Sequence, residues 1–303
     1  MKRMENQFDV IIVGGSYAGL SAAMSLGRSL RKVLVIDSGK PCNIQTPHSN
    51  NFLTQDGKTP KEISTIAKGQ VKKYATVEFC DGLAMQGKKT ENGFEISTKR
   101  GEIFEAKKLI FATGIVDEVP NIKGFWDCWG ISLIHCPYCH GYEFKNKKTG
   151  IIANGERGFH ISSLVNNLTD DLTILTRGKA DFTEEQFQKL EKNNIKIIET
   201  EIDEIQHQKG NIETLILSDG EKLDFDAVYG AFHFKQHSDI PGSLGCEFTE
   251  HGHIKIDNKQ NTTVPGVYAC GDNSCAMRSV ANAVYTGNLT GAMVNMDLTN
   301  EGF

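Results

Sequence analysis

The sequence has no long apolar run near its start and no excess of basic residues. The longest early apolar run, Val10 to Val13, ends at two glycines; it predicts a buried strand and not a signal peptide or membrane span. Lys and Arg number 33 against 38 Asp and Glu, and the net charge of −5 gives no electrostatic basis for binding nucleic acid or an anionic membrane. We therefore expect a cytoplasmic protein with no nucleic-acid or membrane partner, and without a regular disulfide framework.

Proline-rich linkers and low-complexity tracts are also missing. Hydrophobic residues make up 39% of the chain, which excludes disorder as its main theme. The 303 residues are enough for two domains. Glycine is abundant, with 30 of the 303 residues, or about 10%, against a usual share of about 7%. This abundance indicates many tight turns or loops that lie close to a ligand.

The first 37 residues have the order strand, glycine turn, helix, strand, acid. An apolar strand over Phe8–Val13 leads into the loop Gly14–Gly19, a helix follows over Leu20–Leu30, and a strand over Val33–Ile36 ends at Asp37. This order is typical of a dinucleotide-binding βαβ unit. In such a unit, N–H groups at the helix N-terminus bind a pyrophosphate, and the acidic side chain accepts a hydrogen bond from a ribose hydroxyl. The middle glycine of the motif is Ser16 here, and a tight turn without a ligand is the alternative.

A similar order recurs later in the chain, which predicts two nucleotide-binding-type domains. The last strand and helix have no domain of their own, so we expect them to return to the first. The predicted segments are a strand over Thr149–Ala153, a turn over Asn154–Gly158, a helix over Phe159–Leu168, a strand over Leu172–Leu175, a helix over Glu184–Asn193, a strand and turn over Gly266–Asp272, and a helix over Ser279–Met296.

The motif Cys136-Pro137-Tyr138-Cys139-His140 is the strongest chemical signal in the sequence. Two cysteines three apart can close a small disulfide, and one member of such a pair commonly has a lowered thiol pKa. Three other interpretations of the pair are open. A zinc site would need more ligands, and no second C-x-x-C exists; covalent haem attachment would need export of the protein. The third is a pair of buried structural thiols. We favour a redox pair and predict no metal site. The other six cysteines show no pairing by spacing, and we expect small buried hydrophobic side chains there, with an auxiliary role for Cys275 as an alternative.

Together these motifs resemble the low-molecular-weight thioredoxin reductase family of FAD-dependent disulfide oxidoreductases. The resemblance rests on Gly14–Gly19, Ala112-Thr113-Gly114, Cys136–Cys139 and Pro265–Asp272, in this order and with similar spacing. It implies an α/β fold of two three-layer nucleotide-binding-type domains: an FAD domain over 1–117 and 242–303, split around a pyridine-nucleotide-type domain over 118–241. It also implies a homodimer, with Cys139 facing the flavin and Cys136 exchanging with the substrate. The residues that it places against FAD are Gly14, Ser16, Gly19, Asp37, Asn43, Asn51, Gly114, Gly271, Asp272, Ser279 and Val280.

The chain departs from this family at its second glycine loop. The aligned stretch is Ala153-Asn154-Gly155-Glu156-Arg157-Gly158, which lacks the first glycine and would bring a carboxylate near a pyrophosphate. Of the basic cluster that binds the 2′-phosphate of NADPH, only Arg177 matches, and Lys179 is a partial substitute. We expect a degenerate NADPH site.

The residue after the second cysteine also differs, because His140 stands where thioredoxin reductases usually carry Asp. The phrase from Cys136 to Glu143 resembles the branch that contains gliotoxin- and holomycin-type dithiol oxidases. A histidine there is suited to take and return a thiol proton, although a residue bonded to a backbone carbonyl is the alternative.

The sequence thus predicts an FAD-dependent thiol–disulfide oxidoreductase that uses Cys136 and Cys139, with His140 as a third catalytic residue. We expect it to oxidise a dithiol and to pass the electrons to FAD and then to dioxygen. One alternative is a reductase that moves electrons from NAD(P)H or ferredoxin to a thioredoxin-like protein. Another is a flavin redox sensor with low turnover. The expected partner is a small-molecule dithiol or a thioredoxin-like protein.

Overall fold

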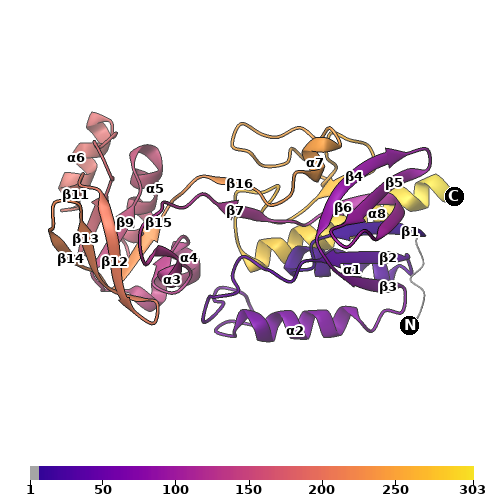
Figure 1. The fold of residues 1–303 in the computed structure, drawn as a ribbon, viewed down its shortest axis with the longest axis horizontal. Coiled ribbons are helices and arrows are strands. Elements are labelled where there is room, and N and C mark those ends of the chain that lie inside the picture. The colour runs from indigo at the N-terminus through magenta and orange to yellow at the C-terminus, as the bar shows by residue number, and fades with distance from the viewer. Residues whose placement is uncertain (1–6) are drawn as a thin grey trace. The chain divides into compact units, whose positions relative to one another are not determined.

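The computed structural model describes residues 7–303, which form two compact units (Figure 1). The first unit comprises the described residues up to Ile44 together with Pro60–Val116 and Phe234–Phe303. The second comprises Gln45–Thr59 and Asp117–His233. None of the described helices is long and apolar enough to cross a membrane.

A seven-stranded mixed sheet forms the centre of the first unit, in the order β3-β2-β1-β6-β5-β4 with β17 also paired to β6. β6 has two partners on one side because its first half pairs with β5 antiparallel and its second half pairs with β17 parallel. The strands are β1 (Gln7–Val13), β2 (Val33–Asp37), β3 (Val77–Asp81), β4 (Ala84–Thr90), β5 (Gly93–Thr98), β6 (Ile103–Phe111) and β17 (Val267–Ala269).

Two helices from opposite ends of the chain pack together in this unit. Gly287 and Gly291 allow the contact, because a Cβ at either position would lie within 2.7 Å of a carbonyl oxygen of the first helix. The helices are α1 (Tyr17–Arg28), α2 (Pro60–Val71), α7 (Ile240–Ser243) and α8 (Val280–Gly302), and a short two-stranded sheet joins β7 (Ile115–Asp117) to β16 (Phe234–Gln236).

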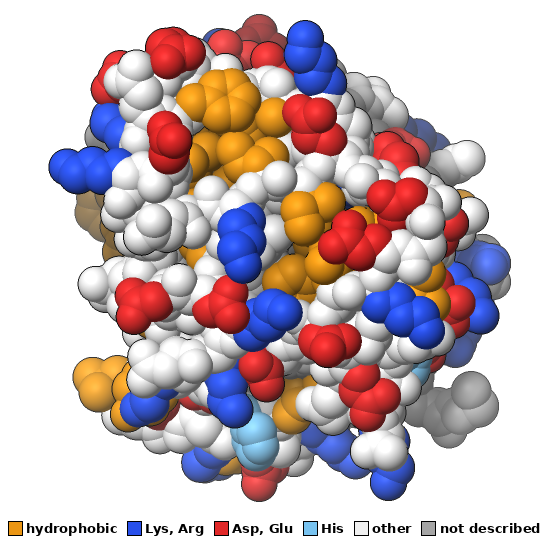
Figure 2. Space-filling model, turned by 90° about the vertical axis from the view of Figure 1, so that its left-hand side faces the viewer, with side chains coloured by type: hydrophobic (Ala, Val, Ile, Leu, Met, Phe, Trp, Pro, Cys, Tyr) orange, Lys and Arg blue, Asp and Glu red, His pale blue; other side chains and the backbone are white. Residues whose placement is uncertain are grey.

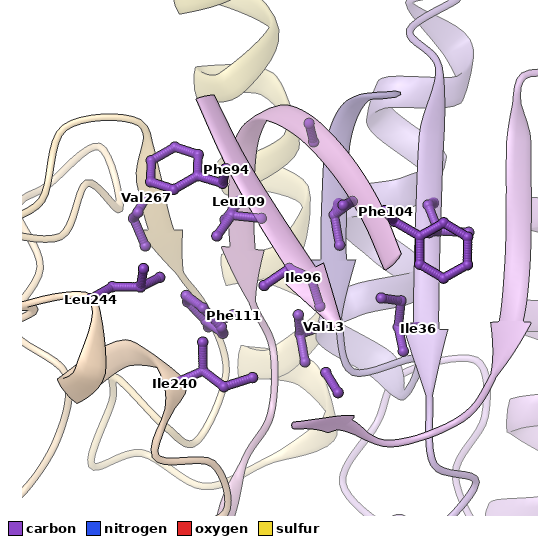
Figure 3. Close-up of a cluster of buried hydrophobic side chains, with 14 of the residues drawn as sticks. Val13, Ile36, Phe94, Ile96, Phe104, Leu109, Phe111, Ile240, Leu244 and Val267 are labelled. Atoms are coloured by element: carbon purple, nitrogen blue, oxygen red, sulfur yellow. The ribbon is translucent and has the colours of Figure 1, made fainter. Parts of the chain in front are cut away.

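One buried cluster of the first unit lies on one face of the sheet (Figure 3), and the residues that alternate with it, such as Val10, Ile12 and Ile110, are buried on the other face. Side chains from β1, β2, β5, β6 and β17 meet Ile240 and Leu244 from the α7 segment. Alternation explains how β5 contributes, because Phe94, Ile96 and Thr98 point inward while the residues between them are only half-buried. Each such apolar side chain stabilises the fold by about 1.5–3 kcal/mol on burial.

The second unit has a five-stranded parallel sheet, in the order β11-β10-β9-β15-β8, and a three-stranded antiparallel meander, β12-β13-β14. The strands are β8 (Leu133–Ile134), β9 (Thr149–Ile152), β10 (Leu172–Leu175), β11 (Lys196–Ile198), β12 (Ile202–Gln208), β13 (Asn211–Leu217), β14 (Lys222–Asp224) and β15 (Ala227–Gly230). The helices are α3 (Phe125–Cys128), α4 (Pro137–His140), a 3-10 turn η1 (Gly141–Phe144), α5 (Gly155–Val165) and α6 (Glu184–Lys192).

The predicted α/β class and the two nucleotide-binding-type sheets are confirmed, but two helix starts were wrong, and the first helix begins at Tyr17 and not at Leu20. Asn154 to Gly158 was expected to be a turn, whereas α5 already begins at Gly155. The Asn154 side chain caps this helix by accepting the Gly155 N–H at 2.8 Å, so the glycines fall in the first helical turn. The expected end at Leu168 is also wrong, because the helix stops at Val165. The last helix, α8, extends six residues beyond the predicted Met296.

Candidate functional site

Four parallel strands of the first unit end at the same level. Val13 of β1 is paired with Ile36 of β2 and with Phe111 of β6, and Phe111 is paired with Ala269 of β17. The loops that follow these strands contain most of the residues predicted to bind a cofactor. Ligands of open α/β sheets bind at the carboxyl ends of the strands, so the register brings the predicted residues of this unit to one edge.

The glycines of the first loop are required by close backbone packing. Gly14 has φ +107°, and a Cβ there would lie 2.2 Å from the Ala112 carbonyl oxygen. A Cβ on Gly19 would lie 1.8 Å from the Gly14 carbonyl oxygen. The loop therefore turns sharply between β1 and α1 and holds the helix against the strand end.

The same turn leaves the N-terminus of α1 open. Ser16 is the N-cap residue in an extended conformation, and within residues 7–303 its hydroxyl caps no backbone N–H. The first turn of α1 carries no acidic side chain. Asp37 Oδ1 accepts the N–H groups of Gly15 at 3.3 Å and Gly39 at 3.2 Å, while Oδ2 has no hydrogen-bond partner in the described chain. One carboxylate oxygen thus shapes the loop and the other remains available for a hydroxyl donor.

Asn273 fixes the loop after β6 and contains an unsatisfied acceptor. This fully buried side chain donates Nδ2–H to the Phe111 carbonyl at 2.8 Å and to Thr113 Oγ1 at 3.2 Å, beside Gly114. Its Oδ1 is buried and has no hydrogen-bond partner among residues 7–303. A buried acceptor without a donor is costly, so this atom marks a place where a donor from a ligand or a water would be accommodated.

The strand end at β17 continues into the start of α8. Gly271 has φ +82° and donates its N–H to Thr286 Oγ1 at 3.1 Å. Asp272 Oδ2 lies 3.9 Å from Arg278 Nε, and both side chains are largely buried. Ser279 caps α8 by accepting the Asn282 N–H at 3.1 Å, and Val280 is its first helical residue.

The two predicted asparagines lie in different units. Asn43, in the first unit, is half-buried and donates to the Tyr17 hydroxyl at 3.4 Å. Asn51, in the second unit, is exposed with φ +58°, and its N–H donates to Asp56 Oδ1 at 2.7 Å.

Cys136 and Cys139 form a disulfide at one end of α4, with their Cα atoms 5.3 Å apart. Cys136 is the N-cap of this one-turn helix, Pro137 is its first residue, and Cys136 Sγ accepts the Cys139 N–H at 3.1 Å. Proline suits this position because it lacks the N–H that a first helical turn leaves unpaired. The N–H and the helix N-terminus both stabilise a thiolate at Cys136 once the disulfide opens.

His140 ends α4 directly after the redox pair. Its ring is half-buried, and burial lowers its pKa below the usual value, an effect that the nearby Glu143 carboxylate partly opposes. In the described part of the chain no hydrogen bond is made to the imidazole, so no backbone carbonyl holds it. A neutral imidazole with free ring nitrogens can accept a proton near neutral pH.

The residues beneath and beside α4 hold the turn in place. Gly141 approaches Leu168 and Tyr229 closely, since a Cβ would lie 2.4 Å from Leu168 Cδ1 and 3.1 Å from the Tyr229 hydroxyl. Asn50 donates Nδ2–H to the Cys139 carbonyl at 3.1 Å. The sequence analysis missed Asn50, which lies 89 residues from its partner and belongs to no motif.

The second glycine loop differs from the first because side chains occupy its helix N-terminus. Asn154 Oδ1 accepts the N–H groups of both Gly155, at 2.8 Å, and Asp181, at 2.9 Å. Glu156 lies in the first turn of α5, where its Oε2 accepts Gln186 Nε2–H at 2.7 Å. Gly158 keeps the packing role of a third glycine, because a Cβ would lie 3.2 Å from the Ala153 carbonyl oxygen.

Of the two basic residues predicted for the 2′-phosphate, Arg177 is paired with a carboxylate and Lys179 is exposed. Arg177 Nε donates to Glu201 Oε2 at 3.0 Å, and Lys179 is exposed. Arg157 contacts His233 Nδ1 at 3.0 Å.

Four of the remaining cysteines are buried and weakly acidic. Burial raises the pKa of Cys80 and of Cys128 to about 11 and that of Cys270 to about 12, and it also raises the pKa of Cys246. Thiols in such surroundings are chemically inert. The expectation of small buried side chains is confirmed for these four, whereas Cys42 is exposed and Cys275 is half-buried.

Comparison with known proteins agrees with this geometry. The family model described as pyridine nucleotide-disulphide oxidoreductase matches residues 8–287. A relative named thioredoxin reductase aclD, from Aspergillus oryzae, is 30% identical over 93% of this chain and 93% of its own length. The solved structures that resemble this chain include two proteins of similar size. They are a putative thioredoxin reductase TrxB from Bacillus anthracis (TM-score 0.93, 29% identity, 98% of this chain and 100% of that one) and HlmI (TM-score 0.92, 27% identity, 99% and 95%).

The predicted resemblance is therefore confirmed at the level of family, fold and enzyme class. With its paired cysteines on α4 and a dinucleotide-type loop in each unit, the chain belongs to the pyridine nucleotide-disulphide oxidoreductase family, as a thioredoxin reductase-like disulfide oxidoreductase.

Proposed function

We propose that this protein is an FAD-dependent dithiol oxidase that passes electrons from a substrate dithiol through Cys136 and Cys139 to FAD and then to dioxygen. The observation that carries the oxidase direction is the contrast at the two helix N-termini. In the first unit no side chain caps an N–H group of α1 in the described chain, whereas in the second unit Asn154 accepts the Gly155 N–H and Glu156 adds a carboxylate to the first turn of α5.

The first unit fits FAD in its loops and in its unsatisfied polar atoms. The open N-terminus of α1 with Ser16 would hold the pyrophosphate, and Asp37 Oδ2 would accept a ribose hydroxyl. The buried Asn273 Oδ1, next to Asp272, would take a further donor. The other residues of this unit that we propose for the site are Gly14, Gly19, Asn43, Gly114, Gly271, Asp272, Ser279 and Val280, and the role of Asn51, which lies in the second unit, stays a prediction from the resemblance. When bound, FAD supplies a two-electron acceptor that dioxygen can reoxidise.

The cysteine pair carries out the thiol chemistry. A substrate thiolate attacks Cys136 Sγ, the Cys136–Cys139 bond breaks, and Cys139 leaves as a thiolate. The second substrate thiol then attacks the mixed disulfide and releases Cys136, which the Cys139 N–H at 3.1 Å stabilises as a thiolate. The overall balance is one dithiol and one dioxygen to one disulfide and one hydrogen peroxide.

His140 is the proposed base for these exchanges. Burial keeps its imidazole neutral to a lower pH than usual, because the pKa is lowered, and no described residue bonds to the ring. It would accept a proton from an incoming thiol and return it later in the cycle.

The second glycine loop opposes binding of NADPH or NADP+, which favours dioxygen as the electron acceptor of this cycle. A pyrophosphate at α5 would have to displace the Asn154 side chain and lie near the Glu156 carboxylate. A 2′-phosphate would compete with Glu201 for Arg177. Both features oppose an anionic ligand.

The proposed organisation follows the same scheme. We propose an FAD domain over 1–117 and 242–303 and a pyridine-nucleotide-type domain over 118–241, in a cytoplasmic homodimer that acts on a small-molecule or protein dithiol. On the face with α6 and β14, acidic and basic side chains alternate around exposed apolar ones (Figure 2). Such a mixed surface offers no single-sign field for a nucleic acid.

An anaerobic titration followed by visible absorbance tests the proposal. We expect NADPH to leave the flavin band unchanged, dithiothreitol to bleach it, and air to restore it with release of hydrogen peroxide. Prompt bleaching by NADPH would overturn the oxidase assignment.

A second candidate is a reductase that delivers electrons from NAD(P)H or ferredoxin to a thioredoxin-like protein. The specific observation in its favour is Gly158, which still packs α5 against the end of β9 as a nucleotide-binding loop requires. It predicts turnover of a thioredoxin with a pyridine nucleotide or ferredoxin in the absence of dioxygen.

A further inference from the structure

One side chain outside the C-x-x-C motif bonds directly to its backbone. Asn50 Nδ2 donates to the Cys139 carbonyl oxygen at 3.1 Å, and both residues belong to the second unit. This carbonyl lies in the peptide between Cys139 and His140, so the bond reaches the backbone between the second sulfur and the proposed base. Among the described residues, this bond to the Cys139 carbonyl is the hydrogen bond that the Asn50 side chain makes.

The segment that carries Asn50 is closed by its own hydrogen bonds. Ser49 donates its N–H to the Lys58 carbonyl at 2.8 Å and accepts the Gly57 N–H at 3.0 Å. On the other side, the Asn51 N–H donates to Asp56 Oδ1 at 2.7 Å. Both neighbours of Asn50 are thereby fixed, so its amide is presented to α4 from a constrained loop.

Helix α4 needs such support because it is only one turn long. A single helical turn fixes several dihedral angles for very few hydrogen bonds and is not stable by itself. The Cys139 N–H is held by Cys136 Sγ at 3.1 Å, and this contact changes whenever the disulfide opens. The Asn50 bond involves no sulfur, so it can hold the other side of Cys139 throughout the cycle.

We propose that Asn50 is a positioning residue that holds the backbone of Cys139 in the geometry required to form and re-form the Cys136–Cys139 disulfide. The inference rests on the proposed function for its role in turnover, but the bond itself acts on the redox pair alone. Without the Asn50 donor, the closed pair loses a hydrogen bond, and Cys139 is less well placed when it must react.

The test compares Asn50→Asp with Asn211→Asp. Aspartate keeps the size of asparagine but removes the donor. Asn211 is a matched control, because it is an exposed asparagine of the same unit that donates Nδ2–H to a backbone carbonyl, that of Gln208, at 3.3 Å. Asn50→Ala removes the donor without adding a charge, and Asn50→Gln restores a donor.

The first readout needs no flavin chemistry. The fraction of reduced pair is measured by thiol alkylation and mass spectrometry in dithiothreitol redox buffers of defined ratio. We expect Asn50→Asp and Asn50→Ala to shift the equilibrium about fivefold toward the dithiol, because an open pair that Asn50 no longer orders loses more conformational freedom when the disulfide closes, and Asn211→Asp to match the wild type. An unshifted or oppositely shifted equilibrium in both Asn50 variants would overturn the proposal.

The second readout is the rate of anaerobic flavin reduction by dithiothreitol in a stopped-flow instrument. We expect the Asn50→Asp and Asn50→Ala rates to fall about fivefold to tenfold at an unchanged half-saturating dithiothreitol concentration, with Asn50→Gln recovering most of the rate. A rise in the half-saturating concentration alone would contradict a positioning role. If the wild type itself is not reduced by dithiothreitol, the proposed function fails, whereas the alkylation result still decides the role of Asn50.

Discussion

The two glycine loops occupy similar places in their units, each after a strand with a parallel neighbour on both sides (β1 or β9) and before the helix that follows, yet they differ at the helix N-terminus. In the first loop Ser16 caps no N–H in the described chain, and Asp37 keeps one oxygen unpaired. In the second, Asn154 accepts two N–H groups and Glu156 brings a carboxylate into the first turn.

A glycine motif combines two roles, the close packing of a helix against a strand and the binding of an anion. The difference between the two loops separates these roles. Gly19 and Gly158 both let a helix approach the strand end before it, so the packing role is present in both units. The side chains between the glycines decide whether an anion can reach the N–H groups. A glycine spacing is thus evidence for a strand–turn–helix geometry, and the intervening residues are evidence for or against a nucleotide.

The largest expected effect comes from removing the packing role in the first loop. Gly19→Ala would place a Cβ 1.8 Å from a backbone oxygen that cannot move away. We expect a loss of about 2–4 kcal/mol of unfolding free energy and of most bound flavin. Gly158→Ala, with its 3.2 Å contact, should cost about 1 kcal/mol or less.

Urea unfolding and the flavin-to-protein absorbance ratio measure both effects. Gly69→Ala is a suitable control, because this glycine is exposed in α2 and a Cβ there meets nothing within 4 Å. It should be neutral or stabilising by about 0.5–1 kcal/mol. Equal losses in Gly19→Ala and Gly158→Ala would show that the two loops are packed alike.

A substitution at His140 tests whether the proton transfer of the second unit takes place at α4 and not at its glycine loop. His140→Ala should slow dithiol oxidation about 100-fold. In the wild type the rate should fall as pH falls through the lowered pKa of His140, because protonation removes the base. The variant should lose this pH dependence, and a matched change at His160, an exposed histidine of α5, should retain it. A pH profile that persists in His140→Ala would assign the ionisation to another group.

Much of the fold and of the first loop could be predicted from local patterns. The apolar strands, the glycine turn and Asp37 lie within a single βαβ stretch, where sequence order and spatial order agree. The start of α5 could not be predicted in this way. Gly155 and Gly158 resemble turn residues, and only the Asn154 cap shows that the helix begins before them.

The features of the site that sequence reasoning missed are pairings between distant segments. Asn50 bonds to a carbonyl 89 residues away, Glu156 to a side chain 30 residues away, and Arg177 to one 24 residues away. None of these residues has a spacing that implies its partner. The sequence identified Glu156 and Arg177 from alignment with a motif, but the partners Gln186 and Glu201 depend on how β10, α6 and β12 are arranged in space.

Two substitutions would give the second loop features of the first. Ala153→Gly with Glu156→Ala restores a first glycine and removes the carboxylate near the proposed pyrophosphate position. We expect NADPH-driven flavin reduction to rise about tenfold from a very low level, since one repulsive charge near an anion is removed. The dithiol reaction should be unchanged, because no described side-chain hydrogen bond joins either residue to α4. If the rate with NADPH stays at the wild-type level, neither the missing glycine nor the Glu156 carboxylate is what limits the nucleotide.

The smallest effect concerns the paired arginine. Glu201→Gln removes the acceptor of the 3.0 Å bond to Arg177 Nε, at a site where both side chains are partly exposed. An ion pair of this kind contributes about 0.2–1 kcal/mol, so stability should hardly change. The freed guanidinium should lower the KM for NADPH about twofold to threefold in the Ala153→Gly/Glu156→Ala background, with no effect on NADH, which lacks the 2′-phosphate. Glu191→Gln, at an exposed residue of α6, serves as the charge-matched control. An equal gain for NADH would mean that the change acts through net charge and not through Arg177.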